Sequence, residues 1–402
     1  MTEQHDIVVI GGGLVGSSLA IALDRAGRRV ALVEAQTAPP ATVASYGERN
    51  LALARASRNG LAAIGVWPRV ATQSTPIQRI HVSRAGEFGS LRMRAEDAGV
   101  DALGFTLPAR ELGAALAAGV AECRQLEHIV PARLTALSWQ GGVWRLQLAL
   151  ADGGQRDLTA RLVVGADGSE SMVRHELGIA VDRHDYAQTL FVATVQPRRP
   201  LAGQAHERFS DAGPVALLPL AGERAGLVLT VANADADAVA ALSDAEFLRL
   251  AMRRLGARPG GLLRPGPRHR HPVARVVARH IVGPRAVLVG NAAQTVHPIG
   301  AQGFNLGLRD ALTLAELVID AADPGAAELL ARYADRRAPD REGVMAFSHG
   351  LVRLACLAEP SLAPLRSLAL LGLGLPPWRR ELARRGMGYR GTPPRAVLER
   401  GP

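Results

Sequence analysis

Residues 7–16 have the sequence Ile-Val-Val-Ile-Gly-Gly-Gly-Leu-Val-Gly, and this stretch decides the fold. Its first four residues are apolar and β-branched, which predicts a short buried strand. The amphipathic residues 17–26, followed by Gly27, predict a helix, and residues 29–33 predict a second strand. The segment is therefore predicted to be a βαβ unit with a glycine-rich first turn.

The glycines of this turn have the spacing of a dinucleotide-binding loop. Gly11 would permit the tight turn, Gly13 would let a pyrophosphate approach the backbone, and Gly16 would let the helix pack closely on the strand. The helix N-terminus would offer N–H groups to the phosphates. Glu34, at the end of the second strand, would accept hydrogen bonds from ribose hydroxyls. These residues predict dinucleotide binding, and a glycine-rich turn without a ligand is the alternative.

Two later segments repeat the pattern of an apolar strand that ends in a small or polar turn. Residues 162–168 are Leu-Val-Val-Gly-Ala-Asp-Gly, and residues 286–290 are Ala-Val-Leu-Val-Gly. The second segment continues into a loop of small residues and a predicted helix over 311–321. A simple NAD dehydrogenase needs no such additional nucleotide-contacting regions, so the two segments favour FAD.

In their order along the chain, these motifs resemble the fingerprints of FAD-dependent aromatic hydroxylases with the para-hydroxybenzoate hydroxylase fold, and they span residues 7–320. Residues 290–310, supported by 49–54, 64–67 and 207–220, are more narrowly similar to ubiquinone-biosynthesis hydroxylases that act on polyprenylated methoxyphenols. The resemblance implies a monooxygenase in which NAD(P)H reduces non-covalently bound FAD. Reaction with O2 would form a flavin C4a-hydroperoxide, whose distal oxygen is transferred to the phenol ring.

The resemblance also assigns cofactor contacts to residues of this chain. Arg49 matches an arginine that approaches the FAD phosphates or the flavin, Arg110 matches another cofactor-facing arginine, and Val130 matches a backbone contact of adenine. Asp167 and Gly168 match a motif that serves both FAD and NAD(P)H. The contacts implied at the tip of the third strand and along the isoalloxazine are Gly290, Asn291, Pro298, Gln302, Gly303 and Asn305.

Two positions depart from the family pattern. Asn291 stands where the family has an aspartate, although an amide still donates and accepts hydrogen bonds. Gly300-Ala301 reverses the usual Ala-Gly order, and only glycine adopts a positive φ freely. No residue is identified as a catalytic base; His297 and Pro298 beside the flavin are the candidates, and a buried core histidine is the alternative for His297.

The predicted fold class is α/β, with a Rossmann-like FAD-binding domain and an inserted antiparallel sheet. The FAD-binding domain is predicted to be discontinuous, over 1–75, 100–180 and 278–345. Residues 76–99 and 181–277 are predicted to form the substrate domain, with strands over 189–195, 215–220 and 226–231, a helix over 244–255 and a loop over 256–272. Residues 346–402 are predicted to be helical.

Composition excludes several other functions. All 47 basic residues counted as Lys or Arg are Arg, so chemistry that depends on a lysine is impossible. The chain contains 2 Cys, far apart, and no cluster with metal-ligand spacing, so neither a disulfide framework nor a metal site is expected. The net charge of +10 accompanies a general abundance of Ala, Arg, Gly and Pro, and therefore does not indicate nucleic-acid binding.

The sequence predicts a cytoplasmic protein, because it shows no signal peptide and no apolar run that spans a bilayer. Residues 361–376 are apolar and precede Trp378 and several arginines, which favours peripheral contact with an anionic membrane or with other ubiquinone-biosynthesis enzymes. An ordinary packing helix is the alternative. Two further functions remain open: hydroxylation of another aromatic compound or an antibiotic, and a non-catalytic nucleotide-binding or membrane-scaffold protein.

Overall fold

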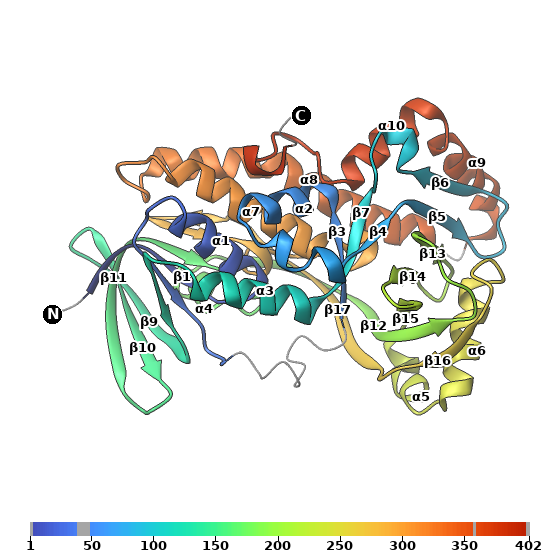
Figure 1. Cartoon of the computed structure of the whole chain (residues 1–402), viewed down its shortest axis with the longest axis horizontal. Coiled ribbons are helices and arrows are strands. Elements are labelled where there is room, and N and C mark those ends of the chain that lie inside the picture. Colours follow the sequence, from blue (N-terminus) through green and yellow to red (C-terminus); the bar gives the residue numbers. More distant parts are fainter. Residues whose placement is uncertain (1–2, 38–48, 357–358, 399–402) are drawn as a thin grey trace.

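The computed structural model describes residues 3–37, 49–356 and 359–398, and its two large sheets lie side by side along the long axis of the molecule (Figure 1). The first sheet contains the glycine-rich turn. Its parallel core has the strand order β19-β11-β1-β2-β8. These strands are β1 (Glu3–Ile10), β2 (Val30–Val33), β8 (Leu126–Ile129), β11 (Gln155–Gly165) and β19 (Ala286–Leu288). Ile7, Val8 and Val9 are fully buried, as expected where both faces of a parallel sheet are covered.

Shorter strands extend this sheet and helices cover it. β9 (Ala132–Gln140) and β10 (Val143–Leu150) form an antiparallel meander on β11, and β18 (Val282–Gly283) pairs with β19. Helix α1 packs against both α3 and α7. The helices of this part are α1 (Leu14–Asp24), α2 (Arg55–Ala63), α3 (Ala109–Ala121), α4 (Met172–Glu176) and α7 (Gln302–Val318).

The second sheet has nine strands, in the order β20-β17-β12-β15-β14-β13-β5-β6, with β16 paired to β12. All its pairs are antiparallel except the parallel pair of β13 and β5. One face packs on helix α6 (Asp244–Leu255), whose Phe247 is fully buried. The strands are β5 (Arg79–Arg84), β6 (Ser90–Arg94), β12 (Val181–Pro197), β13 (Gln204–Phe209), β14 (Val215–Leu220), β15 (Arg224–Ala232), β16 (Leu262–Pro265), β17 (His269–Ala278) and β20 (Gln294–Thr295).

The predicted antiparallel strands lie in β12, β14 and β15, and the predicted helix over 244–255 is α6. The prediction of a loop over 256–272 is wrong in part, because it contains β16 and the start of β17. Pairing with β12 stabilises β16, and such a tertiary contact is not visible in a local sequence rich in Gly, Pro and Arg. The predicted division into a cofactor domain and a substrate domain stays a prediction.

A small third sheet connects the two large ones. β7 (Gly104–Pro108) pairs with β3 (Asn50–Ala54) and β4 (Thr75–Ile77). The hydroxyl of Thr106 in β7 donates to the carbonyl oxygen of Pro219 in β14. A Cβ added to Gly226 of β15 would lie 3.0 Å from Nδ2 of Asn50, so β3 packs closely on the second sheet.

The C-terminal part is helical over the residues that the structure describes. Helix α8 (Ala327–Cys356) runs without interruption through the predicted domain boundary at residue 346. Helices α9 (Ala363–Leu373) and α10 (Pro376–Gly386) then pack beside β6, at the end of the molecule far from β1 (Figure 1). The predicted α/β fold with a Rossmann-like unit, an antiparallel sheet and C-terminal helices is confirmed.

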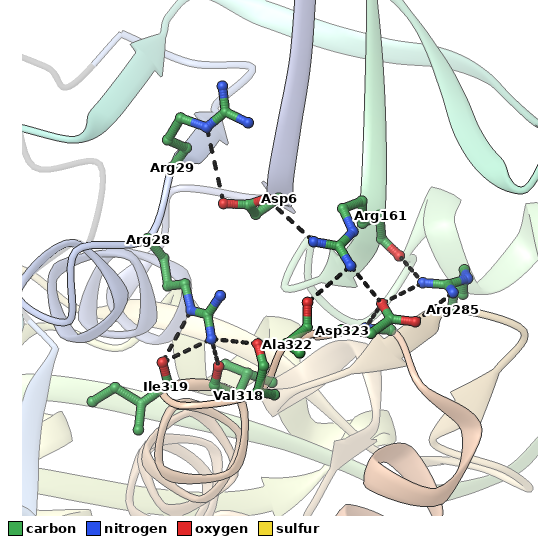
Figure 2. A network of polar contacts seen from close by, with 11 residues as sticks. Asp6, Arg28, Arg29, Arg161, Arg285, Val318, Ile319, Ala322 and Asp323 are labelled. Atoms are coloured by element: carbon green, nitrogen blue, oxygen red, sulfur yellow. Dashed lines mark hydrogen bonds and ion pairs between the residues drawn. The ribbon is translucent and has the colours of Figure 1, made fainter.

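A network of hydrogen bonds and ion pairs joins one end of the first sheet to the end of α7 (Figure 2). Arg28, after α1, donates to the carbonyl oxygens of Val318 at 2.7 Å and Ile319 at 2.8 Å, and a cation suits the C-terminal end of a helix. Arg285, before β19, makes a two-pronged pair with Asp323, at 2.6 and 2.5 Å. The network therefore ties the strand that carries the third motif to the turn after α7.

Candidate cofactor and substrate site

The three glycines of the first motif have different environments. Gly11 has φ +105°, and a Cβ there would lie 2.5 Å from the carbonyl oxygen of Ala166. A Cβ on Gly16 would lie 1.9 Å from the carbonyl oxygen of Gly11, so Gly16 permits the close helix–strand contact. A Cβ on Gly13 would meet no atom within 4 Å. Gly13 precedes the first residue of α1 and has no side-chain cap, so the open space adjoins the N–H groups of a helix N-terminus. This arrangement is a cradle for a phosphate group.

Glu34 lies beside this cradle. Its carboxylate accepts hydrogen bonds from the backbone N–H of Gly12 at 2.6 Å and of Gln36 at 2.8 Å. Its backbone N–H donates to the carbonyl oxygen of Ile129, and its carbonyl oxygen accepts from the N–H of Ala132. These hydrogen bonds place the exposed Val130 next to Glu34. The structure therefore brings the predicted ribose and adenine contacts together, and it gives Glu34 an additional role that sequence reasoning missed, which is to fix the glycine-rich turn.

Asp167 and Gly168 follow β11 and lie against the first motif, since Gly11 faces the backbone of Asp167. The Asp167 carboxylate accepts from the Ser171 hydroxyl at 2.5 Å and from the Val173 N–H at 3.1 Å, so it stabilises the start of α4. Gly168 has φ +87°, and a Cβ there would meet nothing within 4 Å. At this motif, a cofactor can therefore contact Gly168 and those carboxylate lone pairs of Asp167 that do not accept from Ser171 or Val173.

The third motif meets the first one at Gly290. Gly290 has φ +60°, and a Cβ there would lie 3.2 Å from the side chain of Val15 in α1. Gly307 in α7 approaches the same place, because its Cβ would lie 2.9 Å from the Cα of Gly290. Asn291 is exposed at the tip of the turn. All three motifs therefore converge around the start of α1.

The predicted flavin loop, residues 298–303, has an unusual backbone. Gly300 has φ +66° and Ala301 has φ +50°, so both residues of the reversed pair lie in the left-handed region. An alanine there is strained by about 1 kcal/mol or more. Pro298 is exposed, and a Cβ on Gly303 would meet nothing within 4 Å. The loop thus presents an open surface next to the N-terminus of α7.

Asn305 holds this loop in place. Its Oδ1 accepts from the Ala54 N–H at 2.8 Å, and its Nδ2 donates to the carbonyl oxygens of Ala52 at 2.8 Å and Ala301 at 2.7 Å. It therefore joins β3, α7 and the strained turn. The structure gives Asn305 a positioning role, and its predicted direct contact with FAD stays a prediction.

Buried polar atoms without a protein partner lie on neighbouring segments of this region. They are Nδ2 of Asn50 in β3, Nε2 of His271 in β17 and Oε1 of Gln302 in the flavin loop. Gln302 uses only its Nε2, which donates to the Gly300 carbonyl oxygen at 2.9 Å. Burial of such groups is costly unless they are hydrogen-bonded. Together with the open side of Gly13, these donors and acceptors fit a long polar cofactor such as FAD.

Comparison with known proteins agrees with this geometry. The model of the FAD binding domain family matches residues 4–348. The chain belongs to this family. It is 36% identical over 391 residues to ubiquinone hydroxylase UbiL of Rhodospirillum rubrum, covering 95% of this chain and 89% of that one. It is 31% identical to 3-demethoxyubiquinol 3-hydroxylase of Escherichia coli, covering 93% and 95%.

Solved structures show the same fold. p-Nitrophenol 4-monooxygenase PnpA from Pseudomonas putida superposes with a TM-score of 0.80 at 18% identity, covering 96% of this chain and 99% of that one. A probable FAD-dependent monooxygenase, pqsL of Pseudomonas aeruginosa, has a TM-score of 0.77 at 24% identity, covering 92% and 100%. The family match and the two hydroxylase relatives identify the protein as an FAD-dependent monooxygenase, and the predicted family and cofactor are confirmed.

The two predicted arginines lie at different places in this FAD-binding fold. Arg49 is exposed just before β3, and it lies near His271, whose pKa is lowered first by burial and then by the charge of Arg49. Arg110 lies at the start of α3 and pairs with Glu111 at 3.1 Å. Arg49 is therefore beside the group of unpartnered polar atoms, while the cofactor role of Arg110 stays a prediction.

His297, the candidate base, is buried and neutral. Its Nδ1 accepts from the Ile299 N–H at 3.1 Å, so Nε2 carries the proton and donates to Oε1 of Gln188 at 3.3 Å. Burial lowers the pKa of His297 to about 4. The ring of Tyr186 packs edge-on against it, with the ring centroids 4.8 Å apart. The ring nitrogen that lacks a proton, Nδ1, already accepts the hydrogen bond from Ile299. The structure therefore favours the alternative of a buried core histidine, in which His297 shapes the loop.

A buried charge network behind Gly290 was missed by sequence reasoning. Asp310 in α7 accepts from the Gly290 N–H at 3.2 Å and from Nε of Arg337 at 2.7 Å. Arg337 also pairs with Asp340 at 2.8 Å, and Asp340 pairs with Arg309 at 2.7 Å. All four side chains are at most 1% exposed. The positions of these residues in the sequence indicate a charge network only once helices α7 and α8 are known to pack together.

Among the residues that the structure describes, no group of three His, Cys, Asp or Glu side chains is arranged to hold a metal ion. Over the same residues, no helix is both long enough and apolar enough to cross a membrane.

Proposed function

We propose that this FAD-dependent monooxygenase hydroxylates the ring of a polyprenylated methoxyphenol in ubiquinone biosynthesis, with NAD(P)H as reductant and O2 as oxidant. The observation that carries the proposal is the 36% identity to a ubiquinone hydroxylase over 95% of the chain, combined with convergence of the three motifs on one open cradle. Relatives named ubiquinone hydroxylase and 3-demethoxyubiquinol 3-hydroxylase share nearly the full length of this chain, which favours a phenolic lipid over another aromatic compound.

The chain's own residues bind and orient the reactants. FAD, when bound, supplies hydride acceptance and the activation of O2. The N–H groups at the start of α1 and the open side of Gly13 suit its pyrophosphate, and Glu34 suits its ribose. The flavin loop, fixed by Asn305, and the facing sheet would exclude water from the reacting ring, which limits unproductive release of hydrogen peroxide.

The proposal is tested in a strain from which the gene is deleted. We expect the strain to accumulate a prenylated phenol that lacks one hydroxyl group, and expression of the wild-type chain to remove it. A Gly13→Val chain is the matched control and should not restore the product. An unchanged quinone profile in the deletion strain would refute the assignment to this pathway.

We also propose that the enzyme touches a membrane surface through helix α9 and its surroundings. Helix α9 buries polar side chains and exposes apolar ones. Arg366 and Ser367 are buried, while Leu365 is 63% exposed and Leu368 is 59% exposed. Arg366 pairs with Glu87 at 2.6 Å, in the turn between β5 and β6 that carries the exposed Phe88. Apolar side chains that face solvent support contact with a lipid surface.

The sequence around α9 supports an anionic surface in particular. Trp378 is 62% exposed at the start of α10, and Arg380 on the same helix is exposed. Tryptophan and arginine suit the interface of a bilayer with anionic headgroups, where each basic residue adds about 1 kcal/mol. Replacing Leu365 and Leu368 with Ser should weaken sedimentation with phosphatidylglycerol vesicles, with Glu328→Gln on α8 as a surface control. Equal sedimentation of the double variant and the wild type would refute the contact.

A further inference from the structure

Glu207 lies on the face of the second sheet that is turned toward the flavin loop. Side chains alternate along a strand, so Glu207 in β13 shares a face with Phe209. Phe209 packs in one cluster with Val82 of β5 and with Ile299 of the flavin loop. In the parallel pairing of β13 with β5, Glu207 is opposite Val82. Glu207 is therefore an acid on an apolar face that covers the loop.

The carboxylate of Glu207 lies beside the flavin loop, since the strand face that it shares with Phe209 packs on Ile299 and the backbone N–H of Gly300 is near enough to lower its pKa. Burial raises the pKa of Glu207 to about 7, against the opposing effect of the Gly300 hydrogen bond. Glu207 as a whole residue is half-buried, whereas its neighbour Phe209 on the same face is fully buried. An ionised carboxylate accepts about four hydrogen bonds, so a contact with the Gly300 N–H leaves acceptor positions for a phenol hydroxyl.

Over the residues that the structure describes, no neighbouring cation acts on the pKa of Glu207, and the charged groups of the elements packed around it have other partners or lie on the opposite face. Arg84 of β5 pairs with Glu87 and Asp211, and Arg366 of α9 pairs with Glu87. On β13 itself, His206 and Arg208 alternate to the opposite face, where both lie near His81. On the loop, His297 is neutral and engaged with Ile299 and Gln188. The facing residues of β14, Ala216 and Leu218, are uncharged.

A carboxyl group in these surroundings costs stability, since burying it without a cation is unfavourable. The loop that carries the predicted flavin contacts lies beside it, through Ile299 and Gly300. We propose that Glu207 is the base of the substrate site and accepts the proton of the phenol hydroxyl when the ring lies against the flavin loop. This inference rests on the proposed function and supplies the base that neither the motifs nor His297 provide.

The step conserves atoms and charge. The phenol O–H bond breaks, its electron pair stays on the oxygen and enriches the ring carbon that is oxidised, and the proton binds a carboxylate oxygen of Glu207. The oxidised ring carbon later releases its hydrogen as a proton to solvent, and Glu207 returns its own proton to the oxygen of the product. A group that exchanges protons near neutral pH suits this role, because a free phenol ionises only near pH 10.

The test compares holoenzymes of the wild type, Glu207→Gln and Glu207→Asp, with Glu328→Gln as the surface control. The readouts are the pH profile of kcat/KM with a geranylated methoxyphenol and a pH titration of flavin absorbance without substrate. We expect kcat/KM of the wild type to fall below about pH 7. Glu207→Gln should lose about 100-fold at pH 8 and lose the acid limb, while Glu207→Asp, which keeps a carboxyl group, should retain it.

The flavin titration separates this inference from the proposed function. Because Gly300 connects Glu207 to the flavin loop, flavin absorbance should titrate near pH 7 in the wild type and Glu207→Asp but not in Glu207→Gln. A wild type that hydroxylates no prenylated phenol would refute the proposed function, and this titration would still assign the ionisation to Glu207. Equal losses of kcat/KM in the Gln and Asp variants, or a Gln variant that retains the acid limb, would overturn the base assignment.

Discussion

The Gly13→Val change should separate flavin binding from folding. A Cβ at Gly13 meets no protein atom within 4 Å, and the residue has an extended backbone with φ −66° and ψ −174° that valine adopts readily. The free energy of unfolding of the apoprotein should therefore change by less than about 1 kcal/mol. The added methyl groups would instead occupy the space in front of the first N–H groups of α1.

The expected loss of affinity follows from the contacts that the valine displaces. Hydrogen bonds to charged groups contribute about 1.5 to 3 kcal/mol each, and the helix dipole adds up to about 2 kcal/mol. Loss of one such hydrogen bond and part of the dipole term amounts to about 3 kcal/mol, which corresponds to a decrease of roughly a hundredfold in FAD affinity.

The affinity is measured by FAD titration of the apoprotein with tryptophan fluorescence, and its folding by urea unfolding. Gly16→Ala is the matched comparison, because its Cβ would lie 1.9 Å from the Gly11 carbonyl oxygen and should disrupt folding itself. A Gly13→Val protein that retains wild-type FAD affinity would refute the assignment of the cradle. An apoprotein that is unfolded in the Val variant would refute the separation of folding from binding.

The remaining predictions concern the third motif and its support. Asn291→Asp should retain flavin, whereas Asn291→Leu should weaken FAD binding by about 1 to 3 kcal/mol if the exposed amide meets the cofactor; equal affinities in titration would exclude the contact. Ala301→Gly should raise the free energy of unfolding by about 1 kcal/mol by relieving the positive φ, and an unchanged urea midpoint would contradict this. Arg337→Met should cost about 3 kcal/mol in urea unfolding, because it leaves Asp310 and Asp340 buried with one cation fewer, and a loss below about 1 kcal/mol would refute the network's importance. Although burial alone would raise the pKa of Asp340, Arg309 and Arg337 hold it below its usual value, so this stabilisation should be complete above about pH 4 and decline at lower pH, as urea unfolding across pH 2 to 7 would measure.

The sequence predicted the elements whose signal is local. The glycine spacing after an apolar strand predicts the βαβ unit, because the tight turn, the open side of Gly13 and the close contact of Gly16 with Gly11 all lie within one short motif. The roles of Asp310 and Glu207 could not be predicted in this way. Asp310 is one of many charged residues in the sequence, and its burial depends on Arg337 of another helix. Glu207 follows the ordinary alternation of a strand, and only the position of the flavin loop shows what its side chain meets.

A single apolar cluster connects the proposed phenol site with the proposed membrane face. Leu370, on the inner side of α9, packs against the cluster that contains Val82, Phe209 and Ile299. The same helix presents Leu368 to solvent on its outer side. Glu207 shares the sheet face of Phe209, so on these proposals the hydroxyl of the phenol would lie at one side of the cluster and the lipid surface at the other. A prenyl tail is apolar along its whole length. A short apolar passage from the membrane to the flavin loop would keep this tail out of water while the phenol ring of the substrate reaches Glu207. Enlarging Leu370 to Trp should therefore raise KM for a long-chain phenol more than for a geranylated one, and equal KM changes for both substrates would refute a passage along this cluster.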